Sequence, residues 1–193
     1  MNPSGTLPVR VLGTCGIAVP TVGIGCWGIG GPDENLGRLV TATGRDALVL
    51  SSKVGYFAGA APHGFDPGHM RRQLNQTLAN LHTDHLDLYF LHHADFGPAD
   101  IWLEGAVDAI HTFKREGLIR AVGMRGPHRY ALDRLTTPPN LQGGKVARFR
   151  GLFDTIRPDV LAVRDNLLTP PATSEGIFAF AADRHLGVLI TTA

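Results

Sequence analysis

The sequence contains only two cysteines, Cys15 and Cys26, and they are not spaced as a CxxC pair. This excludes a fold held together by disulfides, and we expect a reducing, cytoplasmic location. The nine histidines form no repeated metal-ligand spacing, so we expect no bound metal. No apolar run approaches the length of a membrane span, and the N-terminus lacks the basic and apolar parts of a signal peptide.

Charge is also scarce. Charged residues make up 18% of the chain and the formal net charge is +1, which argues against a nucleic acid or an anionic membrane as partner. Hydrophobic residues make up 44%, an ordinary composition for a globular protein. A chain of 193 residues is long enough for one sizeable core, so we expect residues 1–193 to form a single domain.

Two strand-like segments end in titratable side chains. The first, Ala47–Lys53, ends in an ammonium group, and the second, Leu86–His93, ends in two imidazoles. A helical pattern separates them, which predicts that the two strands are parallel. Because the active site of a parallel barrel lies at the carboxyl ends of its strands, we expect Lys53 and His92 to share a functional site.

The remainder of the chain alternates between helical and strand-like patterns. We expect helices over 34–40, 66–81, about 98–115 and about 174–185, and strands over 21–27, 119–124, 159–164 and 187–191. The section 134–150 is polar and contains Pro138-Pro139 and Gly143-Gly144, which predicts an irregular surface loop before another helix. The alternation predicts an α/β fold with parallel strands. We expect a shortened or incomplete TIM-barrel-like (β/α) fold of about six or seven strands, since the closed form has eight.

Six short motifs follow one another along the chain. They are Arg10–Gly13, Val22–Gly31, Glu34–Arg38, Ser52–Gly55, Leu81–Tyr89 and Gly117–Gly123. With these motifs in this order, the chain resembles the aldo-keto reductases from about residue 9 to 191. The resemblance implies a (β/α)8 barrel that binds NADPH, with a catalytic Tyr supported by Asp, Lys and His. Lys53 and His92 fall on the family positions of the Lys and the His.

The chain departs from the family pattern at five elements of the redox apparatus. The segment that carries the family Asp and Tyr is absent, because Gly31–Asp33 runs directly into Glu34. Arg125-Gly126 replaces the Ser-Asn pair that holds the nicotinamide amide, and Ala162 stands at the family Gln. The family's phosphate-binding loops would lie beyond Ala193. Hydride transfer needs precise placement of its reactants, so we expect the redox site to be lost and no cofactor to bind.

The main hypothesis is therefore a small-molecule enzyme that works by acid–base chemistry without a cofactor. Dehydration, isomerisation or cyclisation in specialised metabolism would suit a Lys–His pair. The candidate catalytic residues are His92, Lys53, Arg125 and Asp165. The candidate substrate-pocket residues are Trp27, Cys26, His93 and Asn166.

Two other functions remain open. One is an NADPH-dependent aldo/keto reductase that is truncated here or completed by a partner, and the other is a non-catalytic binding protein. A salt bridge between Arg125 and Asp165 would be a purely structural use of these residues. A barrel with missing strands also has open edges, which proteins usually cover. We therefore expect a homodimer with Gly187–Ile190 at its interface.

Overall fold

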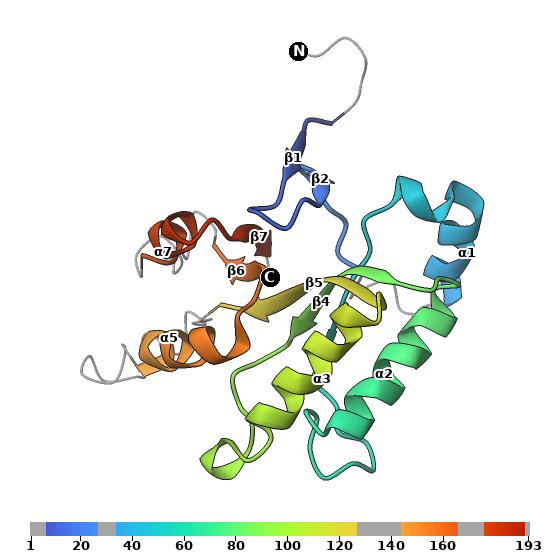
Figure 1. The fold of residues 1–193 in the computed structure, drawn as a ribbon. Helices are drawn as coiled ribbons and strands as arrows, with labels where there is room; N and C mark the ends of the chain where they lie inside the picture. The colour runs from blue at the N-terminus through green and yellow to red at the C-terminus, as the bar shows by residue number, and fades with distance from the viewer. Residues whose placement is uncertain (1–6, 27–33, 127–143, 166–175, 192–193) are drawn as a thin grey trace.

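The computed structural model describes residues 7–26, 34–126, 144–165 and 176–191 (Figure 1). Its centre is a five-stranded parallel sheet in the order β3-β4-β5-β6-β7. The strands are β3 (Ser51–Val54), β4 (Leu86–Leu91), β5 (Ile119–Arg125), β6 (Val160–Arg164) and β7 (Gly187–Thr191). Sequential neighbours pair throughout, so the carboxyl ends of all five strands lie at one edge of the sheet.

Helices connect successive strands, as parallel pairing requires. They are α2 (Pro67–Asn80), α3 (Leu103–Arg115), α5 (Gly144–Ile156) and α7 (Ile177–Asp183), and α1 (Glu34–Thr43) precedes β3. Short 3-10 turns, η1 (Arg45–Ala47) and η2 (Pro98–Asp100), lie before β3 and α3. The start of α2 is fixed by its sequence, because Asp66 accepts a hydrogen bond from the His69 N–H at 2.7 Å and Pro67 occupies the first turn.

The main core lies between the sheet and the helices. Phe65 and the α2 residues Met70 and Leu74 are fully buried there, together with Tyr89 and Leu91 of β4. Burying each large apolar side chain contributes about 1.5–3 kcal/mol. In Figure 1, α2 and α3 run alongside each other on one face of the sheet, where α2 packs beside β3 and α3 beside β5.

The opposite face of the sheet meets an N-terminal hairpin, β1 (Val9–Val11) with β2 (Ala18–Pro20). Leu12 and Ile17 pack there against a second core that includes Leu88 and Phe90 of β4. Gly13, in the hairpin loop, has φ +48° and touches the start of β7, where an added Cβ would lie 2.3 Å from the backbone N of Gly187. The hairpin therefore packs on this face of the sheet near the start of β7, away from the strand carboxyl ends (Figure 1).

Most of the expected elements are confirmed, but two are wrong. Thr21–Trp27 does not form a strand, since residues 21–26 are irregular and residue 27 lies outside the described residues. Val22 and Ile24 are 61% and 88% exposed, and none of the described strands pairs with this segment. Of the loop expected over 134–150, residues 134–143 lie outside the described residues, and the last part is wrong because α5 begins at Gly144 and buries Phe149 against the core.

The predicted shortened (β/α) fold is confirmed. In the described part of the chain the five parallel strands form an open sheet with β3 and β7 at its edges, and the hairpin brings the strand count to seven. None of the described helices is long and apolar enough to cross a membrane.

Candidate functional site

Three predicted catalytic residues stand at the carboxyl ends of three adjacent strands. Lys53 lies in β3, His92 directly follows β4, and Arg125 ends β5. In the register, Lys53 lies opposite Phe90, and Phe90 lies opposite Gly123. Side chains alternate between faces along a strand, so Lys53, His92 and Arg125 all belong to the sheet face that carries Phe90. The hydrogen bond from the His92 N–H to the Val54 carbonyl, 2.9 Å, holds these ends together.

Arg125 and His92 are in direct contact. Nη1 of Arg125 lies 2.9 Å from Nε2 of His92. A guanidinium only donates hydrogen bonds, so Nε2 must be the acceptor and the ring must be neutral, with its proton on Nδ1. In this geometry His92 orients Arg125, and its Nε2 carries no proton to give to a substrate.

The electrostatic surroundings agree with a neutral His92. Burial, followed by the positive charges of Arg125 and Lys53, lowers the pKa of His92 to about 4. Burial and then the charge of Arg125 also lower the pKa of Lys53 below its ordinary value. A lowered pKa makes the Lys53 ammonium a stronger acid, so Lys53 is better suited than His92 to donate a proton at neutral pH.

Tyr56 belongs to the same site, although the sequence analysis did not select it. Its ring lies edge-on to the His92 ring, with centroids 5.0 Å apart, and its side chain is 53% exposed. Gly55, with φ +109°, turns the chain between Lys53 and Tyr56. The signal was available, because Tyr56 is three positions after Lys53 in the loop that leaves a strand end, where barrel enzymes place functional residues.

His93, expected in the substrate pocket, has both ring nitrogens engaged in backbone hydrogen bonds. Its Nε2 donates to the Gly55 carbonyl at 2.7 Å, and its Nδ1 accepts from the Asp95 N–H at 3.2 Å. The ring also packs edge-on against Phe65. These contacts fix the loops that follow β3 and β4, so His93 supports the site by positioning Lys53 and His92.

The other expected residues lie after β6, in the irregular segment 21–26, or outside the described residues. Asp165 directly follows β6 and is partly buried, whereas Cys26 is exposed, with its Sγ 3.8 Å from the Ile24 carbonyl. Trp27 and Asn166 lie outside the described residues. No group of three His, Cys, Asp or Glu side chains with the geometry of a metal site occurs among residues that the structure describes.

Arg164, a basic residue, is the second residue after Tyr56 that the sequence pattern did not single out. It ends β6, and Arg125 pairs with Ala162 two positions before it. Ala162 packs on the hairpin side of the sheet, so alternation assigns Arg164 to the same face as Arg125. The period-two pattern Val160-Ala162-Arg164 was the signal that could have found it.

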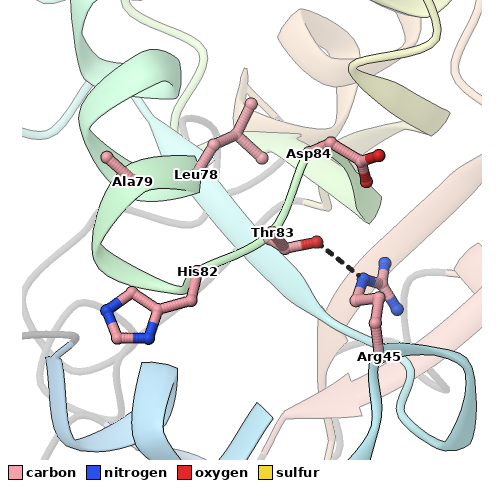
Figure 2. Close-up of a pocket in the computed structure, with 6 residues that line it drawn as sticks. All are labelled: Arg45, Leu78, Ala79, His82, Thr83 and Asp84. Carbon is pink, nitrogen blue, oxygen red and sulfur yellow. Dashed lines mark hydrogen bonds between the residues drawn. The ribbon is translucent and has the colours of Figure 1, made fainter. Parts of the chain in front are cut away.

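A surface hollow lies at the other end of β4 and has a structural explanation. Figure 2 shows it between the end of α2 and the segment before β4, lined by Arg45, Leu78, Ala79, His82, Thr83 and Asp84. The Arg45 guanidinium donates to the Thr83 hydroxyl at 3.0 Å and to the buried Asp87 carboxylate at 2.8 Å. It also donates to the carbonyls of Leu48 and His85. Arg45 therefore holds the start of β4 in place.

Asp87 is the centre of that structural network. Its side chain is 1% exposed and accepts hydrogen bonds from Arg45, from Arg120 at 2.7 Å and from the Leu50 N–H at 2.8 Å. Burial alone would raise the pKa of Asp87, but these hydrogen bonds outweigh burial and the pKa lies below its ordinary value. The lowered pKa of Asp87 is thus explained by this network of hydrogen bonds, which stabilises the fold.

A parallel α/β sheet whose carboxyl edge carries titratable side chains is an arrangement that this chain shares with TIM-barrel-like folds. Residues 26–190 match the model of the Aldo/keto reductase family. The chain belongs to the aldo/keto reductase family.

Individual relatives agree with this assignment. The chain is 32% identical to D-arabinose 1-dehydrogenase of Saccharomyces cerevisiae over 92 residues. The aligned residues make up 48% of this chain and 26% of that protein. The chain thus aligns with about a quarter of that enzyme's length. A thermostable aldo-keto reductase, Tm1743, solved with the inhibitor epalrestat, matches with a TM-score of 0.71 at 20% identity, over 94% of this chain and 71% of that one. The holo form of the aldo-keto reductase AKR11C1 from Bacillus halodurans matches with a TM-score of 0.66 at 18% identity, over 96% and 66%.

The family assignment corrects the expectation that no cofactor is used. The matched family is one of reductases, and the curated relative is a dehydrogenase, a reaction that moves a hydride to or from a redox cofactor. The expected cofactor-free chemistry is therefore wrong, and the reductase alternative has the better support. The departures at Arg125 and Ala162 are real, but they do not establish a loss of redox function.

Proposed function

We propose that this chain is an oxidoreductase that acts on a carbonyl group of a small molecule with a nicotinamide cofactor. The observation that supports it best is the grouping of Lys53, His92 and Arg125 at three adjacent strand ends, in a chain that belongs to a reductase family. We further propose that residues 1–193 act as one domain and that the substrate enters at this edge of the sheet.

The residues at this edge suit a nicotinamide dinucleotide, which is an anion with flat rings. Lys53 and Arg125 supply positive charge, and Tyr56 presents an exposed aromatic ring beside His92. These residues would hold the cofactor. When bound, it supplies the hydride for the carbonyl carbon.

The side chains of the site then account for the charge and the proton at the carbonyl oxygen. Arg125, oriented by its hydrogen bond to His92, stabilises negative charge that develops on the oxygen. Lys53 donates the proton, because burial and the charge of Arg125 have lowered its pKa toward the working range of an acid. Tyr56 forms a wall of the site.

The experiment compares NADPH-dependent reduction of small aldehydes by the wild-type chain and by Lys53→Met. General acid catalysis contributes about 10²–10⁴-fold, so we expect kcat to fall by that factor. Lys114→Met is the matched control, since Lys114 binds Asp159 at 2.7 Å at the opposite end of the sheet. Tyr56→Phe keeps the ring beside His92 and should lower kcat less than about tenfold.

Three results would contradict the proposal. The first is the absence of saturable NADPH binding and turnover in the wild-type chain. The second is an unchanged kcat in Lys53→Met. In the third, Tyr56→Phe abolishes turnover while Lys53→Met does not, which would make the phenol the acid.

A further inference from the structure

The loop that leaves β4 holds two consecutive residues in the left-handed backbone region. Ala99 has a φ of 49° and Asp100 has a φ of 58°, and neither residue is a glycine. In this region the Cβ of an L-residue crowds the following carbonyl oxygen, so two such residues in a row are strained. Strain of this kind persists only where surrounding contacts enforce it. The contacts that hold this loop must therefore outweigh the strain.

A side chain of α5 supplies such contacts. The Arg148 guanidinium donates two hydrogen bonds to the Asp100 carboxylate, and the one from Nη1 is 2.7 Å long. Its Nε and Nη2 also donate to the Ala94 carbonyl, at 3.2 and 2.9 Å. The hydrogen bonds from Arg148 hold the pKa of Asp100 below its ordinary value, so both partners are charged at neutral pH. This two-point pair is a strong form of charge-assisted hydrogen bond, and it clamps both ends of residues 94–100 to α5.

The clamp joins the two strand–helix units whose strand ends meet in the candidate site. His92 begins the loop that Arg148 holds, and it lies two residues before Ala94. Arg125 ends β5, and α5 is the described helix that follows β5. The contact of 2.9 Å between Arg125 and His92 therefore spans the same two units as the hydrogen bonds of Arg148. Movement of the loop relative to α5 would consequently change the contact between Arg125 and His92.

We infer that Arg148 is a positioning residue of the site, which holds His92 in contact with Arg125 by clamping residues 94–100 to α5. Its hydrogen bonds go to Ala94 and Asp100, so it acts on the site through the loop and not by direct contact. The effect of Arg148 on turnover rests on the proposed function, in which Arg125 stabilises charge at the carbonyl oxygen. Its effect on the His92 ring can be measured without any turnover.

The first experiment follows the imidazole of His92 in the whole chain by NMR over a pH titration, with the spectrum of His92→Gln identifying its signals. The wild type should show a neutral ring with its proton on Nδ1 and a pKa of about 4. Arg148→Gln and Asp100→Asn should each raise the pKa of His92 toward the ordinary 6.5, because the ring moves away from Arg125. Arg148→Lys keeps the charge without the planar fork and should give an intermediate pKa. Arg150→Gln, at an exposed position on the same helix, is the matched control and should leave the pKa unchanged.

A second control separates positioning from a general loosening of the fold. Glu116→Gln removes another two-point ion pair, which Glu116 forms with Arg71 of α2. This variant should lower the melting temperature about as much as Asp100→Asn does, but it should leave the pKa of His92 unchanged. If Arg148→Gln and Asp100→Asn leave the pKa of His92 unchanged, or if Glu116→Gln raises it equally, the inference is overturned.

Turnover is the second readout. With NADPH and a small aldehyde, kcat of Arg148→Gln should fall by about tenfold to a hundredfold, the size of effect that a small misplacement in a site produces. KM should change less than kcat, and Arg148→Lys should recover part of the loss. If Arg148→Gln reduces the aldehyde as fast as the wild type does, the inference fails while the proposed function survives. If the pKa of His92 responds as expected but the wild type reduces no carbonyl compound, the positioning of His92 stands and the proposed function fails.

Discussion

The neutral state of His92 should make the protein sensitive to acid. The folded-state pKa of about 4 lies below the ordinary 6.5, so the unfolded chain binds a proton here at a higher pH than the folded chain does. The contribution to stability is therefore complete above pH 6.5 and is lost as the pH falls toward 4. The full difference corresponds to about 3 kcal/mol, and solvent screening of the partly buried ring reduces it to about 1–2 kcal/mol.

Urea unfolding of the wild type and His92→Gln at pH 7.5 and 4.5 measures this contribution. Gln keeps an acceptor for Arg125 but does not titrate, and acid effects on other groups cancel in the comparison. Lowering the pH should reduce the free energy of unfolding of the wild type by about 1–2 kcal/mol more than that of the variant. If the difference between the two proteins is the same at both pH values, the reasoning about His92 is refuted.

Three further predictions concern the scaffold. Asp87→Ala leaves Arg45 without its buried carboxylate and should lower the free energy of unfolding, measured in urea, by about 3–5 kcal/mol. Asp84→Ala is the control, because the Asp84 side chain is 93% exposed, and it should lower the free energy of unfolding by less than about 0.5 kcal/mol. Equal losses in the two variants would contradict the proposed role of the Asp87 network. Gly13→Ala should destabilise the protein more than Gly16→Ala does, because both glycines have a positive φ but only Gly13 touches Gly187. Equal melting temperatures of the two variants would argue against the packing of the hairpin loop on Gly187. We also propose that two chains pair along the β7 edge. The wild type should then elute as a dimer in size-exclusion chromatography, and Ile190→Lys, at a 58% exposed position, should elute as a monomer. A monomeric wild type would refute the proposed dimer.

Local sequence signals were sufficient for much of the fold. Asp66-Pro67, followed by Met70 and Leu74 at helical spacing, predicted α2 from its first residue. The expected strand 187–191 coincides with β7. These elements carry their capping and core-facing residues within a few positions, so no knowledge of distant contacts was needed.

The wrong predictions depend on contacts that are distant in sequence. Val22 and Ile24 alternate with glycines as a strand would, but no strand in the described structure lies beside them. The hairpin β1–β2 has only three residues in each strand, and it is stabilised by packing Leu12 and Ile17 onto the sheet. Such tertiary pairing is not encoded in a short window.

The structure brings three of the predicted site residues to neighbouring strand ends, and their functional roles stay predictions. The rule that function lies at strand ends placed Lys53, His92 and Arg125 together, and the structure brings Arg125 into contact with His92. No local pattern in the sequence shows that Nε2 of His92 accepts this bond, the contact on which the proposal of Lys53 as proton donor depends. Tyr56 and Arg164 were missed because their relevance depends on which face of the sheet they join.

Deuterium transfer is the most direct test of the claim that these strand ends form a carbonyl oxidoreductase site. NADPH deuterated at its transferring carbon is incubated with the chain and a panel of small aldehydes, and the products are analysed by mass spectrometry. We expect an alcohol that carries the deuterium, formed far more slowly by Lys53→Met. An alcohol without deuterium, or no alcohol from any aldehyde with a preparation that binds the cofactor, would contradict the claim.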